Sequence, residues 1–378
     1  MPTAPRQHVL LVPGFFGFAN LGDFAYFGHV RDFFARYLRR HGIAGEVIVV
    51  QTFPTASLRR RATRVLETMA ELLDRSDGDV HLIGHSSGGL DVRLLTAPEV
   101  QLPTTLDVDK YAQKIRTVVT LSSPHRGSPL ATALSSVLGA QILKLISLVT
   151  IYTLRTGRVP IAAVFYLVRL LSLRRLPIAA GTLLNNIYRD LLSDFSGDRR
   201  EALEKFMVTV GDDQELLGQV TPAAMDLFNA TTFDRPGVRY GSVITCARPP
   251  GVRTSLAVGL SPFRQATHVL FAAFHRVTAR MPATTIGLTH AQQRKLVRAY
   301  GRLPELRDND GMVPTLSQVW GDVVHAAWGD HLDAIGHFYM PTHVPPHFDW
   351  LNSGQRFTLG EFERIWLDVA RFLFRPPN

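Results

Sequence analysis

Two glycines bracket a serine directly after an apolar stretch. The segment VHLIGHSSGGLDVR covers residues 80–93, and its residues 84–88, GHSSG, match the pattern G-x-S-x-G. This pattern is typical of a sharp strand-to-helix turn, where larger side chains would collide with the strand and the helix. We therefore predict that Ser86 is a nucleophile and that backbone N–H groups at the helix start face the reacting oxygen. A glycine-rich turn with an incidental serine is the structural alternative.

A second candidate element is HVLLVPGFFGF at residues 8–18, where a strand is expected to end at Pro13-Gly14. In a site of this kind, one oxyanion donor comes from the residue after the nucleophile, here Ser87. The other comes from the loop after an early strand, here Phe15. We predict that the N–H groups of Phe15 and Ser87 form an oxyanion hole, with a turn stabilised by aromatic packing as the alternative.

A serine hydroxyl needs a base to remove its proton, and an imidazole needs a carboxylate to fix its tautomer. The chain order in such folds is serine, acid, histidine. RDNDGMVP supplies Asp308 and Asp310, and WGDHLDAIGHF further along supplies His331. We favour Asp310 as the acid, because a glycine follows it in a tight turn before an apolar pair, and His331 as the base. The competing histidines are His325 and His337.

These residues need a scaffold, and the hydropathy pattern predicts one. Short apolar runs rich in β-branched residues alternate with longer segments of helical period, which is typical of a mostly parallel α/β sheet. Strands are expected at residues 8–12, 46–51, 79–83, 117–121, 240–245 and 321–325. Helices are expected from about 27 to 42 and from about 57 to 73. In the second helix the apolar positions recur at helical spacing, and the other face carries Arg59, Arg60, Arg61 and Arg64.

We expect one domain over residues 1–378, with two regions that interrupt the alternation. Residues 131–192 are rich in leucine and isoleucine, with arginines but few acidic residues, and residues 252–303 are again apolar and basic. Across 235–307, Glu305 is the only carboxylate. Both regions are interpreted as helical insertions that form a lid or cap, with additional core helices as the alternative.

Several motifs together are similar to those of the bacterial triacylglycerol lipases, a family in the α/β-hydrolase superfamily. They are GHSSGGLDVR, LSSPHRGSPLA at residues 121–131, NDGMVP and DHLD, in the family's order. VTPAAMDLFNATTF at residues 220–233 resembles the segment before the family's acid. The resemblance implies an α/β-hydrolase fold, with a mostly parallel central sheet flanked by helices and a lid. It also implies a triad of Ser86, Asp310 and His331, with Phe15 and Ser87 at the oxyanion.

The sequence departs from the family at the oxyanion loop and at the calcium site. The HG that commonly precedes the oxyanion residue is PG here. Family members often hold calcium through an aspartate two positions after the histidine and another upstream of the acid. Asp333 matches the first, but no aspartate occurs between Asp234 and Asp308. We therefore expect no cofactor, with Asp333 as the calcium candidate.

Composition excludes several classes of protein. The chain has 378 residues, of which 46% are hydrophobic and 19% charged, which is too apolar for a disordered protein. The single cysteine, Cys246, excludes an intrachain disulfide and a cysteine-built zinc site. His325, His331, His337, His343 and His347 lack a zinc-ligand spacing such as H-E-x-x-H, so no zinc site is predicted.

The net charge of +9 favours an anionic partner. No nucleic-acid binding is expected, because the arginines do not alternate with aromatic residues and no DNA-binding motif occurs. Apolar residues near 142–171, interrupted by charges, are too short for a membrane span. The arginines in and after this stretch suit peripheral contact with anionic lipid, and a solvated cationic face is the alternative. They are Arg155, Arg158, Arg169, Arg174 and Arg175. The expected location is cytoplasmic or peripheral to a membrane, since no signal peptide is recognised.

The function predicted from these residues is serine-dependent hydrolysis of lipid-like carboxylic esters through an acyl-enzyme, as in a triacylglycerol lipase or carboxylesterase. An acyltransferase that uses the same triad is the first alternative. A non-catalytic lipid-binding protein on a hydrolase fold is the second.

Overall fold

The computed structural model describes residues 5–15, 26–135, 160–172, 215–283 and 286–375. It also describes isolated positions at 145, 149, 189, 193, 197, 200 and 201. Among the described residues, no helix is both long and apolar enough to cross a membrane.

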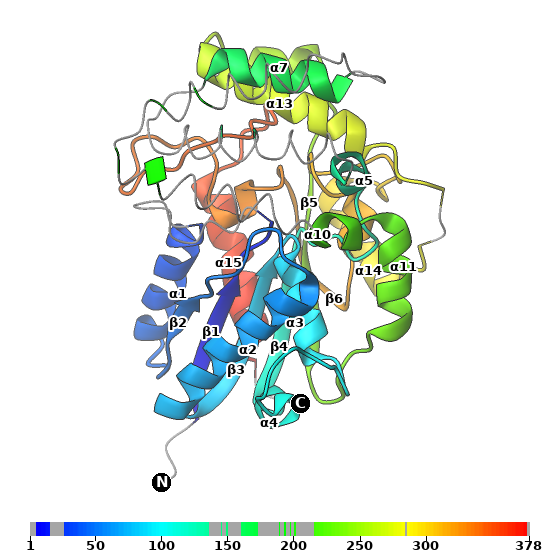
Figure 1. Ribbon diagram of the computed structural model, residues 1–378. Helices are drawn as coiled ribbons and strands as arrows, with labels where there is room; N and C mark the ends of the chain where they lie inside the picture. Colours follow the sequence, from blue (N-terminus) through cyan, green and yellow to red (C-terminus); the bar gives the residue numbers. More distant parts are fainter. Residues whose placement is uncertain are drawn as a thin grey trace.

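The described strands form a six-stranded sheet in which every neighbouring pair is parallel, in the order β2-β1-β3-β4-β5-β6. All the strands predicted from the sequence are confirmed, and β2 is shorter than expected. Their bounds are β1 Arg6–Val12, β2 Val47–Val49, β3 Gly78–His85, β4 Ile115–Leu121, β5 Arg239–Cys246 and β6 Asp322–Trp328. The carboxyl ends of these strands lie at the upper edge of the sheet in Figure 1.

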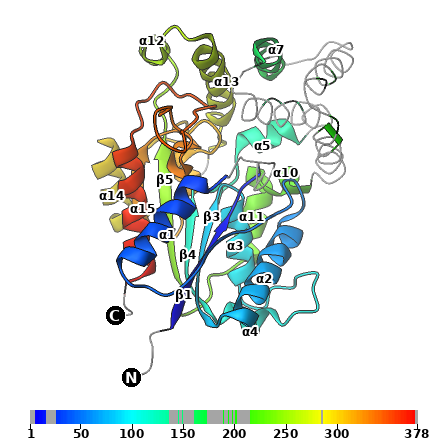
Figure 2. The ribbon, with the colours of Figure 1, turned by 90° about the vertical axis from the view of Figure 1, so that its left-hand side faces the viewer.

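Helices cover both faces of the sheet. α1 (Gly28–Arg40) and α15 (Leu359–Leu373) lie on one face, and α2 (Leu58–Arg75) and α3 (Gly88–Thr96) lie on the other (Figure 2). The two helices predicted near residues 27–42 and 57–73 are therefore confirmed. The remaining named elements are α4 Val108–Ala112, α5 Pro129–Leu134, α7 Ile161–Ser172, α10 Glu215–Gln219, α11 Pro222–Thr231, α12 Val252–Val258, α13 Pro262–Thr278, α14 His290–Tyr300, η1 Thr315–Gln318 and η2 Asp333–Ile335.

The apolar strands are explained by burial on both faces. Successive side chains of a strand point to opposite faces, so a doubly covered strand is apolar throughout. Val9 and Leu11 of β1 join the core beneath α1 and α15, whereas Leu10 and Val12 join the core beneath α2. Trp366 of α15 is fully buried in the first core.

Among the described helices, α7 and α13 lie above the sheet, beyond the carboxyl ends of the strands, in both ribbon views. α13 packs against α7 and α5. α14 packs instead on the edge strand β6, so the region 252–303 supplies both a helix above the sheet and a helix at its flank. Most of 131–192 lies outside the described residues, including Arg155, Arg158, Arg174 and Arg175.

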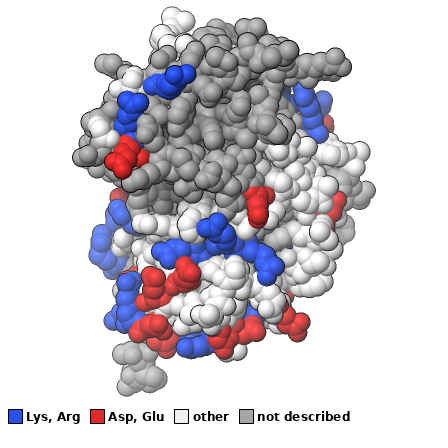
Figure 3. Space-filling model, in the orientation of Figure 1, with Lys and Arg blue, Asp and Glu red and all other residues white. Residues whose placement is uncertain are grey.

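The described surface carries charges of both signs. In Figure 3 a band of Lys and Arg crosses the face, and Asp and Glu gather below it, toward the amino ends of the strands. Arg59 and Arg60, at the start of α2, are exposed on the side of the carboxyl ends.

Candidate active site

Ser86 occupies a tight turn between β3 and α3. Its φ is +55°, in the left-handed region that non-glycine residues rarely adopt, and its N–H donates to the Leu121 carbonyl at 2.8 Å. A Cβ on Gly84 would lie 2.3 Å from the Gly88 oxygen, and one on Gly88 would lie 2.3 Å from the Val12 oxygen. The two glycines of the motif are therefore required by direct backbone contact, as the sequence analysis predicted.

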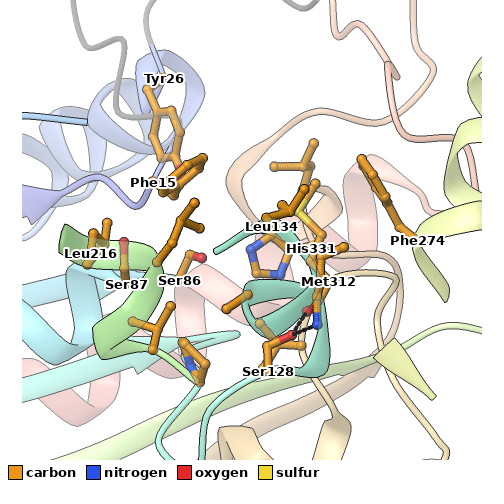
Figure 4. Close-up of a pocket in the computed structure, with 17 residues that line it drawn as sticks. Phe15, Tyr26, Ser86, Ser87, Ser128, Leu134, Leu216, Phe274, Met312 and His331 are labelled. Atoms are coloured by element: carbon orange, nitrogen blue, oxygen red, sulfur yellow. Dashed lines mark hydrogen bonds between the residues drawn. The ribbon is translucent and has the colours of Figure 1, made fainter. Parts of the chain in front are cut away.

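His331 and Asp310 form a buried pair. His331 Nδ1 lies 2.8 Å from Asp310 Oδ2, and the His331 N–H donates to the Asp310 carbonyl oxygen at 2.9 Å. Because an ionised carboxylate only accepts hydrogen bonds, Nδ1 carries the proton and Nε2 keeps its lone pair. Figure 4 shows the Ser86 hydroxyl directed toward the His331 ring across the pocket.

The Asp310 carboxylate is held from several sides. Its Oδ1 accepts the N–H groups of Met312 at 2.9 Å and Val313 at 2.7 Å. Its Oδ2 also accepts from Thr245 Oγ1 at 3.0 Å and Gln318 Nε2 at 3.1 Å. These bonds fix the carboxylate in the orientation that His331 needs. Nothing in the local sequence of Thr245 or Gln318 links them to residue 310, so the sequence alone does not predict these contacts.

Ser86 and His331 line one apolar pocket with a cavity of about 70 Å³. Phe15 and Ser87 line the same pocket, and Ser87 is the N-cap residue of α3. The rest of the wall is mainly aliphatic and aromatic, with Tyr26, Pro124, Ser128, Leu130, Ala131, Leu134, Leu216, Leu217, Val220, Phe274, Met312, Val313 and Leu332 (Figure 4). The structure thus brings Ser86, His331 and the two expected oxyanion residues together.

A chain of hydrogen bonds connects the loop before Phe15 to the backbone of His331. His85 Nε2 lies 2.8 Å from the His331 carbonyl oxygen, which only accepts, so Nε2 carries the proton. Burial lowers the pKa of His85 well below its ordinary value, so the ring is neutral and Nδ1 accepts. The Tyr26 hydroxyl therefore donates to Nδ1 at 2.6 Å, and the Gly14 N–H donates to the Tyr26 oxygen at 3.3 Å.

Arg61 contradicts one sequence prediction. The sequence pattern predicts it on the face opposite the apolar residues of its helix, but its side chain is fully buried and pairs with Asp91 at 2.8 Å. Its Nη2 also donates to the Pro13 carbonyl oxygen at 2.8 Å, so this ion pair anchors the strand end before Phe15. Arg61 lies three residues after the buried Leu58 and four before the buried Val65. That spacing was the available signal for its burial.

The competing candidates have other partners. His325 Nδ1 lies 2.8 Å from Asp368 of α15. Asp308 pairs with Arg302 at 2.6 Å, and the Arg302 hydrogen bond helps to lower the pKa of Asp308 against the effect of burial. Burial lowers the pKa of His337 to about 3. None of these three residues lines the pocket that contains Ser86.

Asp333 belongs to a buried acidic cluster with Asp330 and Asp349. Burial raises the pKa of Asp330 to about 7, and burial together with the Asp330 charge raises the pKa values of Asp333 and Asp349 well above the ordinary value. Asp349 Oδ1 is buried without a hydrogen-bond partner. Carboxylate oxygens are the ligands that calcium prefers, but the ligand atoms of these three carboxylates do not all lie within 4.8 Å of one another, so the cluster is not arranged to hold one ion.

No protein-family model matches the sequence, and no curated protein matches it either. Three solved bacterial or metagenomic structures are similar across 99% of this chain. The metagenomic carboxyl esterase MGS0156 has 16% identity and a TM-score of 0.53 over 76% of its own length. EstA from Clostridium botulinum has 17% identity and a TM-score of 0.53 over 88% of its length. Staphylococcus hyicus lipase has 15% identity and a TM-score of 0.52 over 97% of its length.

The chain has the α/β-hydrolase fold. The fold prediction from the sequence is thereby confirmed. One fold can serve many activities, so the function of this chain depends on the residues of its pocket.

Proposed function

We propose that this protein hydrolyses apolar carboxylic esters through an acyl-enzyme on Ser86. The observation that carries the proposal is the pocket shared by Ser86, at a φ of +55°, and His331, whose Nδ1 is bonded to Asp310. Triads are recognised by this geometry and these roles rather than by sequence position. The structural relatives described as a carboxyl esterase and a lipase support the same reaction class.

In the proposed reaction, His331 Nε2 takes the Ser86 proton as Oγ attacks the ester carbonyl carbon. Asp310 stabilises the imidazolium that results. The tetrahedral oxyanion is stabilised by the N–H groups of Phe15 and Ser87. His331 then protonates the leaving alcohol, which leaves the acyl group on Ser86. Water, deprotonated by the same imidazole, releases the carboxylic acid and restores the serine.

The wall of the pocket favours an apolar acyl group. Its side chains are mainly aliphatic, and the polar Ser86 and His331 are adjacent to one another. The cavity of about 70 Å³ is smaller than the about 300–1,000 Å³ typical of small-molecule sites. This difference favours a wall that moves when substrate enters. We infer that α5, α10 and α13, which supply Leu134, Leu216 and Phe274, form the part that opens.

Activity on p-nitrophenyl esters from short to long acyl chains tests the proposal. The wild type should cleave them, and Ser86→Ala should lower kcat by about 10⁴-fold or more while its thermal unfolding stays cooperative. Equal activity in both proteins would exclude Ser86 as the nucleophile. No activity in the wild type, in detergent or with lipid, would favour the lipid-binding alternative. A maximum at short chains would identify a carboxylesterase rather than a lipase.

A further inference from the structure

Three histidines from distant parts of the chain meet beside the loop that follows His331. His29 lies in the first turn of α1, and His343 and His347 lie in a turn closed by the bridge between Met340 and His347. One ring nitrogen of each histidine lies within 4.8 Å of those of the other two. Within the described ranges, no other group of three or more His, Cys, Asp or Glu side chains converges in this way.

Backbone carbonyls fix the tautomer of each ring. A carbonyl oxygen only accepts, so the ring nitrogen beside it must carry the proton, and the other nitrogen of a neutral ring keeps its lone pair. His29 bonds to the Pro346 carbonyl. His343 Nδ1 lies 2.8 Å from the Pro345 carbonyl oxygen, and His347 Nδ1 lies 2.7 Å from the Gly336 carbonyl oxygen. Metal-binding histidines in proteins usually donate their second nitrogen in this manner.

His347 provides an independent indication of a ligand. Its Nε2 is buried and has no hydrogen-bond partner. The His347 ring stacks on the His29 ring at a centroid distance of 3.6 Å and on the Phe338 ring at a centroid distance of 4.2 Å. Leaving a buried acceptor unpaired has a cost in stability, which a bound cation would remove.

We propose that His29, His343 and His347 bind one Zn²⁺ ion through the ring nitrogens that are not bonded to carbonyls. Three imidazoles leave the fourth tetrahedral position to water or a small anion. Zn–N bonds of about 2.0–2.1 Å bring the ligand nitrogens closer than 4.8 Å, so the rings must converge on binding. His29, half-buried at the start of α1, is the ring that turns out of the stack, because Phe338 holds His347 in place.

The site would connect two elements that flank the pocket. His29 lies three residues after Tyr26, which lines the pocket. His347 bonds to the carbonyl of Gly336, which directly follows η2 in the loop after His331. Zinc at this position therefore acts as a clamp between α1 and the loop that carries the base. It is expected to raise stability and to have no role in the chemical step.

Metal binding by the chelator-treated protein tests this proposal. Zn²⁺ titration by calorimetry should give one site per chain, and Co²⁺ should give visible absorption bands of a tetrahedral ion. His29→Gln and His343→Ala should each lower the Zn²⁺ affinity by about tenfold or more and abolish the Co²⁺ bands. His41→Ala, at the other end of α1 and stacked on Tyr37, is the matched control and should bind like the wild type.

His343 lies in a half-buried turn, so His343→Ala should fold even if His29→Gln does not. A wild type that does not bind Zn²⁺, or equal affinities in the wild type, His29→Gln and His343→Ala, would overturn the proposal.

Discussion

At the scale of single residues, Asp310 is more tightly held than its role as a partner of one imidazole requires. The Met312 and Val313 N–H groups occupy one carboxylate oxygen, and Thr245, Gln318 and His331 share the other. Such a constrained acid fixes the tautomer and orientation of His331.

Replacing this acid tests its role. Asp310→Asn should lower kcat on the preferred ester by about 10⁴-fold, because the amide no longer imposes the tautomer in which His331 Nε2 is basic. Esterase assays with thermal unfolding as a folding control give the measurement. A variant that is folded and retains near wild-type kcat would show that another group orients His331.

Tyr26 is expected to act as a positioning residue. Tyr26→Phe removes the hydroxyl between the Gly14 N–H and His85 Nδ1, so the oxyanion loop and the His331 backbone lose their connection. We expect kcat to fall by about tenfold and the free energy of unfolding by about 1–3 kcal/mol.

The matched control is Tyr300→Phe. Tyr300 is also buried and donates to the Ile244 carbonyl at 2.9 Å, but it does not line the pocket. Its loss should lower stability without changing kcat. If the two variants lose kcat equally, the effect of Tyr26→Phe reflects general destabilisation rather than positioning.

At the scale of elements, the junction of β3 and α3 depends on contact with β1. Gly88 begins α3 directly against the carbonyls of Val12 and Pro13. Arg61 of α2, paired with Asp91 of α3, also holds this end of β1 by donating to the Pro13 carbonyl oxygen. Three elements that are distant in sequence thus share the placement of the oxyanion loop and the nucleophile.

Gly88→Ala should therefore be strongly unfavourable. Its Cβ would lie 2.3 Å from the Val12 oxygen, so either the helix or the strand end must shift. We expect the free energy of unfolding to fall by about 1–3 kcal/mol, and activity to fall as well. Gly287→Ala is the control, because no atom lies within 4 Å of its Cβ. This variant should keep the wild-type stability in chemical denaturation and the wild-type activity in ester assays.

At the scale of the whole molecule, buried neutral histidines make the fold sensitive to acid. Burial lowers the pKa of His81 to about 3, that of His275 to about 4, and that of His125 well below its ordinary value. The unfolded chain binds protons at these sites below about pH 6.5, whereas the folded chain does not. The contribution of these residues to stability is therefore lost as the pH falls.

His81 allows a test with one titrating group. Its ring bonds to Thr117 Oγ1 at 2.7 Å and to Gln7 Oε1 at 2.8 Å. Between about pH 6 and pH 3.5, the wild type should lose about 1.4 kcal/mol of unfolding free energy per pH unit more than His81→Gln, which cannot titrate. Urea denaturation across this range gives both slopes. Parallel slopes would show that His81 is protonated in the folded chain.

The alternation of strands and helices, the glycine-flanked turn at Ser86 and the order of Ser86, Asp310 and His331 were all readable from the sequence. Each depends on local rules: strand and helix periodicity, the absence of room for a Cβ, and short turns around a carboxylate. These features predicted the parallel sheet and selected the residues that line or adjoin the pocket.

Other features depended on contacts that no local pattern encodes. Thr245 and Gln318 meet Asp310, Tyr26 meets His85, and Arg61 is buried against Asp91 only because chain segments far apart fold onto one sheet edge. The convergence of His29 with the turn at 343–347 has the same origin. Spacing along the chain determines which residues share one element, but packing between elements decides which side chains from different elements come within hydrogen-bonding distance.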